Sequence, residues 1–216
     1  FHPRKAKTTA DGGMLTKANA ALDAEFRLWR QHGMSVLDVV RHGSPSVIFE
    51  SYPVLGYNYR MTDIQAAVGR EQIKRLPGIL EARREIAARY DEALDGIAGV
   101  TPPHEPDWAR SNWQSYCVRL ALDINQRAVM QRLLDRGVST RRGIMCAHLE
   151  PAYEAEPWSS IDPNADAPKE AGPLLESERA QRECILLPLF VQLTINEQDF
   201  VVSALRDAVR DERGAG

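Results

Sequence analysis

The sequence predicts an α/β protein, and three observations from its C-terminal half support this. Residues 113–122 alternate in polarity, which is typical of a strand with one buried face. Thr194 and Glu197 form a T-x-x-E capping box ahead of an apolar pattern with helical period. Residues 184–188 form a short apolar run that ends at a proline, which indicates a buried strand. From residue 113 onward the order is strand, helix, strand, loop, helix, strand and helix, which describes a compact α/β unit.

Composition and charge restrict the class of protein. The chain has 216 residues, of which 44% are hydrophobic and 26% charged, as in ordinary soluble globular proteins. The net charge of -3 argues against a broad nucleic-acid or membrane surface. No apolar run approaches the roughly 18 residues that are needed to span a bilayer. The cysteines show neither zinc-site spacing nor a disulfide framework, so we expect no metal site and a reducing cytoplasm.

The first 60 residues carry few structural signals. Residues 14–16 are predicted to form a short buried strand, and residues 18–32 a helix with a partly apolar face. Gly33 follows at the position that a glycine beyond a helix end often takes. Residues 43–53 begin with a glycine and contain two prolines, so we expect a loop there.

Two helices are predicted in the middle of the chain. Thr62 and Gln65 form a T-x-x-Q capping box that starts the first helix. Pro77 is expected to interrupt it, because proline lacks the amide hydrogen that a helix interior uses. A second helix is predicted at 79–94, so that the pair forms a kinked bridge between two domains.

The C-terminal unit is predicted to follow a proline-bearing linker at 99–112. Its other expected elements are a helix capped by Asp123 and Gln126 and closed by Gly137, a strand at 138–140, a long polar loop to Pro173, a helix at 174–183, and a disordered tail at 211–216. The predicted apolar helix faces are Val129, Met130, Leu133 and Leu134 in one helix, and Phe200, Val201, Ala204, Leu205, Ala208 and Val209 in the last.

A basic stretch opens the chain, Phe1-His2-Pro3-Arg4-Lys5, and a glycine pair follows at positions 12 and 13. Lysine forms Schiff bases with carbonyl compounds, and nearby cations lower its pKa and so favour that chemistry. On composition alone, however, a solvated basic tail is the better interpretation. The stretch by itself therefore leaves the role of Lys5 open.

Several separated motifs change this. They are the lysine segment Phe1–Met14, the stretch Gly56-Tyr57-Asn58-Tyr59-Arg60-Met61 with Thr62–Ala67 (a GxNxRMxxxxAA pattern), Arg83–Tyr90, Arg136–Arg142 with His148 and Pro151–Tyr153, and Leu187-Pro188-Leu189-Phe190 with the capping stretch that follows. In this order they resemble the DegT-type sugar aminotransferases, pyridoxal-phosphate (PLP) enzymes of the aspartate-aminotransferase fold. Lys7 and the pair Ala10-Asp11 depart from the family pattern, which puts the exact geometry of the loop after Lys5 in question.

The resemblance implies a PLP-transferase-like α/β fold. The chain would hold a remnant of the cofactor-binding large domain at 1–60, kinked bridging helices at 61–98 and a small C-terminal α/β domain at 99–216. Family members carry a long part of the large domain ahead of this lysine, so we expect further sequence upstream. A non-catalytic fragment, or a dimerisation or binding module that lacks those elements, is the alternative.

The resemblance also implies an activity and partners. The enzyme would transfer an amino group from an amino acid such as glutamate to a keto sugar, expected to be nucleotide-linked. It would act as a cytoplasmic homodimer with shared active sites, with PLP as its cofactor and no metal, nucleic acid or membrane.

Three residues are implied to act on the cofactor. Lys5 would hold PLP and move the proton during transfer, whereas a histidine at this position marks the dehydrating branch of the family. Asn58 would reach the phosphate of the cofactor in the partner subunit, and Arg60 would bind phosphate or carboxylate. A surface lysine, a turn asparagine and a structural ion pair are the respective alternatives. His2 is a further candidate near the cofactor.

Three more residues are implied to lie near the substrate, namely Arg141, Arg142 and His148. A nucleotide-linked sugar carries a diphosphate, which the planar guanidinium of arginine binds well. The alternative is that both arginines are ordinary solvated side chains and that His148 is a loop histidine.

Overall fold

The structure is a computed structural model that describes residues 1–214 except 2–4, 37, 154–158, 161–168 and 171–173. The chain divides into two compact units, residues 1–77 and residues 78–216. The domain boundaries inferred from the resemblance stay a prediction.

Three helical segments occur in the described part of the first unit: α1 at Ala20–Trp29, α2 at Asp38–His42 and the start of α3, which spans Asp63–Leu94. Asn19 caps α1, since its side chain accepts hydrogen bonds from the amides of Ala21 and Leu22. The helix predicted at 18–32 is therefore confirmed in a shorter form. Gly33 has a φ of 72°, the left-handed conformation for which glycine is suited.

The strand predicted at 14–16 is wrong. Met14 is 63% exposed and Leu15 is 74% exposed, and neither lies in a strand. A strand needs a neighbouring backbone to complete its hydrogen bonds. Among the described residues of the first unit, the only bridge of this kind joins Gln31 to Asn58, well away from residues 14–16.

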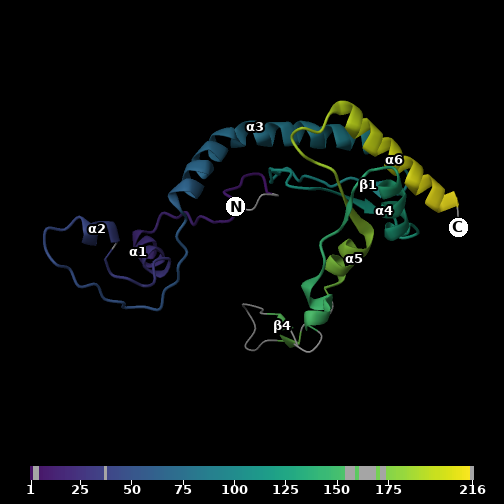
Figure 1. Cartoon of the computed structure of the whole chain (residues 1–216). Coiled ribbons are helices and arrows are strands. Elements are labelled where there is room, and N and C mark those ends of the chain that lie inside the picture. Colours follow the sequence, from purple (N-terminus) through teal and green to yellow (C-terminus); the bar gives the residue numbers. More distant parts are fainter. Residues whose placement is uncertain (2–4, 37, 154–158, 161–168, 171–173, 215–216) are drawn as a thin grey trace. The chain divides into compact units, whose positions relative to one another are not determined.

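Helix α3 is continuous, so the prediction of two helices separated at Pro77 is wrong (Figure 1). Proline removes one hydrogen bond from a helix interior, but a long helix with intact turns on both sides can absorb that loss. The predicted capping box at the start of α3 is confirmed. The amide of Thr62 donates to Gln65 Oε1 at 3.0 Å, and the amide of Gln65 donates to Thr62 Oγ1 at 3.2 Å.

The second unit is built on a four-stranded antiparallel sheet in the order β1-β2-β6-β3. Its strands are β1 at Val100–Thr101, β2 at Tyr116–Leu120, β3 at Arg141–Arg142 and β6 at Cys184–Leu187. The helices are α4 at Gln126–Asp135, α5 at Leu175–Glu183 and α6 at Ile195–Gly214, with short 3-10 turns η1 at Ala147–Leu149 and η2 at Pro151–Tyr153. A small hairpin pairs β4 at Ser159–Ser160 with β5 at Lys169–Glu170.

The hydrophobic core of this unit lies between one face of the sheet and helices α3, α4 and α6. Alternate residues of β2, namely Tyr116, Val118 and Leu120, are buried in it, so the predicted alternation of that strand is confirmed. The helices contribute Ile86, Ala87, Tyr90, Leu94, Val129, Leu133, Val201, Val202, Ala204, Leu205, Ala208 and Val209. The apolar faces predicted for α4 and α6 are therefore largely confirmed, except that Leu134 and Phe200 are exposed.

Three other expectations for this unit need correction. The cap of α4 is Asn125, whose Oδ1 accepts from the amide of Ala128 at 3.1 Å, because Asp123 is paired with Arg213 instead. The strand predicted at 138–140 is displaced to Arg141–Arg142, the residues of β3, where the backbone pairs with β6. The predicted disordered tail is wrong for residues 211–214, which are helical, while 215–216 lie outside the described residues.

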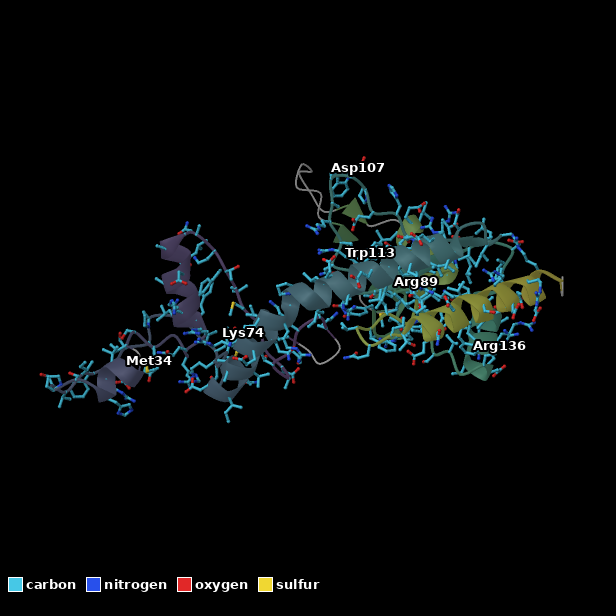
Figure 2. All side chains as sticks on the ribbon, turned by 90° about the horizontal axis from the view of Figure 1, so that it is seen from above. Met34, Lys74, Arg89, Asp107, Trp113 and Arg136 are labelled. Atoms are coloured by element: carbon cyan, nitrogen blue, oxygen red, sulfur yellow. The ribbon has the colours of Figure 1, made fainter. Side chains whose placement is uncertain are left out.

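Ion pairs join α6 to neighbouring parts of the second unit along its length. Arg89 of α3 lies 2.7 Å from Asp199, and Arg136 lies 2.8 Å from Asp207; Figure 2 labels both arginines. The hydrogen bond from Arg136 holds the pKa of Asp207 below its usual value. Arg213, in the last turn, pairs with Asp123 at 3.2 Å, in the segment that leads into α4.

The second unit should lose stability steeply at alkaline pH. Burial raises the pKa of Tyr90 and of Tyr116 above the usual range, and burial beside Cys184 raises that of Cys117 to about 11. The unfolded chain releases these protons from about pH 9–10 upward while the folded chain retains them, so the free energy of unfolding should fall as the pH rises, by at most about 1.4 kcal/mol per pH unit for each group and, for Cys117, only up to about pH 11. Urea titrations at pH 8, 10 and 11 measure this slope. Tyr116→Phe should make it shallower, and an unchanged slope would contradict the assignment.

None of the helices in the described part of the chain has the length and hydrophobicity required to cross a membrane. Within the same residues, no group of three histidine, cysteine, aspartate or glutamate side chains is arranged to hold a metal ion. Cys117, Cys146 and Cys184 are all free thiols.

Candidate functional site

The loop that carries Lys5 is attached to the first turns of α3. Gln65 Nε2 donates to the backbone oxygen of Asp11 at 3.0 Å, and Thr9 Oγ1 donates to the same oxygen at 3.0 Å. A further bond within the loop runs from the amide of Ala10 to Thr8 Oγ1 at 3.0 Å. These bonds give residues 8–12 a defined turn although most of them are exposed.

Lys5 itself is exposed, and the residues on either side of it help to anchor its loop. The ammonium of Lys7 lies 4.8 Å from the centre of the Phe1 ring, a cation–π contact. Phe1 and Lys7 also line a small cavity of about 140 Å³ together with Thr9, Met61 and five residues of α3, namely Ala66, Gly69, Arg70, Gln72 and Ile73. The side chain of Lys5 therefore emerges from a segment that is packed against a helix.

Asn58 and Arg60 lie next to each other on the segment that leads into α3. Arg60 Nε donates to Asn58 Oδ1 at 3.0 Å, and one terminal nitrogen of Arg60 lies 3.4 Å from His32 Nε2. Backbone bonds hold this segment against the end of α1, from the amide of Tyr57 to Trp29 at 2.7 Å and from that of Tyr59 to Arg30 at 3.0 Å.

Two glycines make this close approach of backbones possible. A Cβ atom on Gly56 would lie 2.0 Å from the amide nitrogen of Gly33, and one on Gly33 would lie 2.0 Å from the carbonyl oxygen of Val54. Both distances are far below van der Waals contact, so a side chain at either position would push the two segments apart.

The pair Asn58 and Arg60 can bind an anion. Because Asn58 Oδ1 accepts from Arg60, the amide nitrogen of Asn58 is oriented to donate to an external acceptor. The guanidinium of Arg60 supplies further donors in a planar array, which suits phosphate or carboxylate. Both side chains are exposed, so an anion would not have to enter a closed site.

In the second unit, Arg141 and Arg142 form the edge strand β3 and are both exposed. Arg142 lies 3.4 Å from Glu150 Oε1 across the turn that follows. An exposed ion pair of this length contributes little to stability. The pair therefore leaves Arg142 able to exchange Glu150 for another anion.

His148 is mostly buried and contacts α5. Its Nε2 lies 3.0 Å from Glu178 Oε1, with the two side chains only 11% and 15% exposed. Two more bonds hold the neighbouring segment, from the amide of Gly143 to the backbone oxygen of Cys184 in β6 at 2.5 Å and from the amide of Cys146 to the side chain of Gln181 in α5. The start of the loop predicted from the sequence is therefore held to β6 at Gly143 and to α5 at Cys146 and His148.

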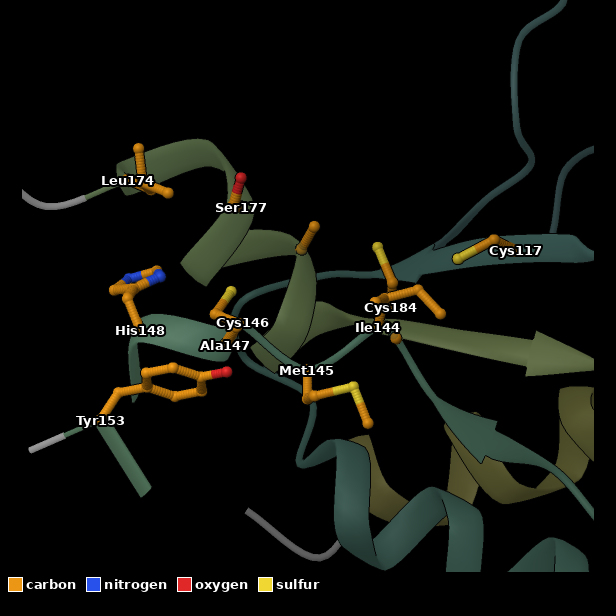
Figure 3. A pocket seen from close by; sticks show the side chains of 12 residues that line it. Cys117, Ile144, Met145, Cys146, Ala147, His148, Tyr153, Leu174, Ser177 and Cys184 are labelled. Atoms are coloured by element: carbon orange, nitrogen blue, oxygen red, sulfur yellow. The ribbon is translucent and has the colours of Figure 1, made fainter. Parts of the chain in front are cut away.

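A cavity of about 680 Å³ opens beside this segment, on the sheet face away from the core. Figure 3 shows His148, Tyr153 and Leu174 at one end and Cys117 and Cys184 at the other. Its lining is largely apolar, and it is large enough for a small organic molecule.

The structure brings only some of the predicted site residues together. Asn58 and Arg60 are in contact, and both are joined to the Lys5 loop through the start of α3. Arg141, Arg142 and His148 lie in the other unit, where His148 borders the cavity. His2 lies outside the described residues.

Sequence reasoning missed two residues of these sites. His32 faces Arg60 across 28 residues of sequence, and no local pattern signals such a contact. Glu178, the partner of His148, has no local signal either. The bond from Gln65 to Asp11 was missed as well. The capping box uses only the side-chain oxygen of Gln65, so its side-chain nitrogen was a donor without an assigned partner.

The comparison with protein families decides the classification. A sequence model of the DegT/DnrJ/EryC1/StrS aminotransferase family matches residues 1–206. The chain belongs to this family. The resemblance noted from the sequence motifs is thereby confirmed.

Individual relatives and solved structures agree with the family. The spore coat polysaccharide biosynthesis protein SpsC of Bacillus subtilis is 28% identical over 216 residues, which cover 97% of this chain and 52% of SpsC. The crystal structure of the aminotransferase TlmJ from Streptoalloteichus hindustanus superposes with a TM-score of 0.75 at 29% identity, over 94% of this chain and 49% of TlmJ.

A putative sugar aminotransferase of Streptococcus pneumoniae, Spr1654 in its PMP form, superposes with a TM-score of 0.80 at 24% identity, over 98% of this chain and 52% of that one. The predicted α/β fold of PLP-dependent transferases is thus confirmed. The chain spans about half the length of the relatives it matches.

Proposed function

We propose that the protein is a PLP-dependent aminotransferase that transfers an amino group from an amino acid, expected to be glutamate, to a keto sugar that is nucleotide-linked. One observation carries this proposal: the family match covers a segment in which an exposed lysine, Lys5, sits on a loop packed against α3. Residues 1–60 would belong to the cofactor-binding domain, 61–98 to the bridge and 99–216 to the small domain.

The donor set of the first unit fits PLP. Lys5 offers a primary amine for the aldehyde, while Asn58 and Arg60 offer N–H groups for the phosphate. When bound, PLP supplies the electron sink that makes the α-hydrogen of an amino acid acidic. Lys5 Nζ would accept and return that proton. In a homodimer, Asn58 would reach the phosphate of the cofactor in the partner subunit, and Arg60 would bind phosphate or carboxylate.

The second unit supports an anionic acceptor. Arg141 and Arg142 are exposed on an edge strand, and their guanidinium groups suit a diphosphate. His148 borders the cavity beside them and would orient a sugar hydroxyl. SpsC is a polysaccharide biosynthesis protein and Spr1654 is a putative sugar aminotransferase, and both relatives favour a sugar acceptor. The composition and cysteine usage favour a cytoplasmic enzyme.

The proposal is tested by finding which lysine bonds to PLP. The purified 216-residue chain is mixed with PLP, reduced with borohydride to make any C=N linkage permanent, digested and analysed by mass spectrometry. We expect the pyridoxyl group on Lys5, in preference to Lys7, Lys17, Lys74 and Lys169. The label should vanish from the Lys5→Ala protein and persist in the Lys7→Ala protein.

Random labelling of all lysines, or a label that survives in Lys5→Ala, would contradict the role of Lys5. A chain that takes no label at all would favour the alternative of a dimerisation or binding module.

A further inference from the structure

Gln65 uses both ends of its side-chain amide. Its Oε1 accepts from the amide and from the hydroxyl of Thr62, each at 3.0 Å, which completes the capping box of α3. Its Nε2 donates to the backbone oxygen of Asp11 at 3.0 Å. A capping box requires only the oxygen, so the bond to Asp11 is an additional function of this side chain.

The surface of α3 around Gln65 is shaped to receive the loop. A Cβ on Gly12, whose φ is 150°, would lie 2.9 Å from Met61 Cε and 2.9 Å from Thr9 Oγ1. A Cβ on Gly69, one turn beyond Gln65, would lie 3.0 Å from Thr9 Cγ2. Thr9 of the loop therefore lies close to Gly69 of α3, and Gly12 lies close to Met61 just before the helix, so the loop contacts this region on either side of the hydrogen bond made by Gln65.

We propose that Gln65 is a positioning residue that couples the Lys5 loop to the segment bearing Asn58 and Arg60. Met61 and Thr62 directly follow that segment, so the side-chain amide of Gln65 fixes both the Lys5 loop and this segment to the first turn of α3. The effect on catalysis rests on the proposed function, in which Lys5 acts on PLP. The mechanical part, that Gln65 holds the loop, rests on the contacts alone.

Gln65→Glu separates the two uses of the side chain. Glutamate keeps the oxygens of the capping box and is favoured at this position, but it lacks the donor for Asp11. We expect helix content and thermal unfolding to stay unchanged. Trypsin should cut after Lys7 roughly 3–10-fold faster, because the loss of one hydrogen bond raises the population of the open loop by about that factor. Cleavage after Lys17, beyond the loop, serves as the internal reference. In the whole enzyme, kcat should fall by a similar factor while the KM for the amino donor stays the same.

The chain offers a matched control in its second capping box. Glu197 accepts from the amide and the hydroxyl of Thr194, each at 2.8 Å. Glu197→Gln makes the reverse exchange in the same geometry without a loop attached, and it should leave cleavage after Lys7 and kcat unchanged. Equal cleavage after Lys7 in Gln65→Glu and in the original protein would overturn the proposal.

Failure of the proposed function would look different. If Lys5 of the original protein takes no pyridoxyl label, the activity assignment fails, and the cleavage ratio still decides whether Gln65 holds the loop. If Lys5 is labelled and Gln65→Glu changes neither the cleavage ratio nor kcat, the assignment stands and the positioning role is wrong.

Discussion

In the aminotransferase proposed above, replacing Lys5 by alanine is expected to lower transamination by the whole enzyme by about 10²–10⁴-fold, the contribution typical of a positioned general acid–base group. The amine would be lost both as the anchor of PLP and as the proton carrier. Steady-state rates with an amino donor and a keto sugar measure the effect.

Two further variants separate charge from chemistry. Lys5→Arg keeps a cation but offers no amine that can be deprotonated near neutral pH, so it should be as inactive as alanine. Lys7→Ala loses only the contact with the Phe1 ring and should retain most of the activity. Substantial activity in Lys5→Arg would show that Lys5 acts through its charge.

Replacing Tyr116 by alanine is expected to lower the free energy of unfolding by about 3–5 kcal/mol, as for other buried aromatic side chains. Tyr116 is fully buried, its ring lies 4.8 Å from that of Tyr90 between centroids, and its hydroxyl donates to Asp91 Oδ1 at 2.5 Å. Urea unfolding monitored by circular dichroism measures the loss.

A double-mutant cycle assigns the part that belongs to the hydroxyl. Tyr116→Phe should cost about 1–3 kcal/mol, because it leaves the carboxylate of Asp91 without its donor. Asp91→Ala combined with Tyr116→Phe should cost less than the sum of the two single changes, since each removes the same bond. Strict additivity would mean that the hydrogen bond does not contribute to stability.

The sequence predicted best those elements whose signals are local. The capping boxes at Thr62 and at Thr194, the alternation of β2 and the glycine after α4 depend on residues within a few positions of one another, and the structure confirms them. The family motifs identified the fold, because several separated patterns in order are far more specific than any one of them.

Long-range contacts explain the errors. Asp123 and Asn125 are both suitable helix caps, and the ion pair of Asp123 with Arg213 leaves the cap to Asn125. Residues 14–16 have the composition of a strand but pair with no other strand among the described residues. For the site, the sequence predicted which residue types would bind the cofactor but not their contacts. Arg60 and His32, and Asp11 and Gln65, are far apart in the sequence, and no local pattern predicts that they meet.

The continuity of α3 through Pro77 has a consequence for folding. Starting a helix is the costly step, whereas lengthening an existing one is easy. Residues 78–94 are stabilised by the core of the second unit, so they can serve as the nucleus from which the helix propagates back towards Thr62. The turn that holds the Lys5 loop would then be the last to form and the first to fray.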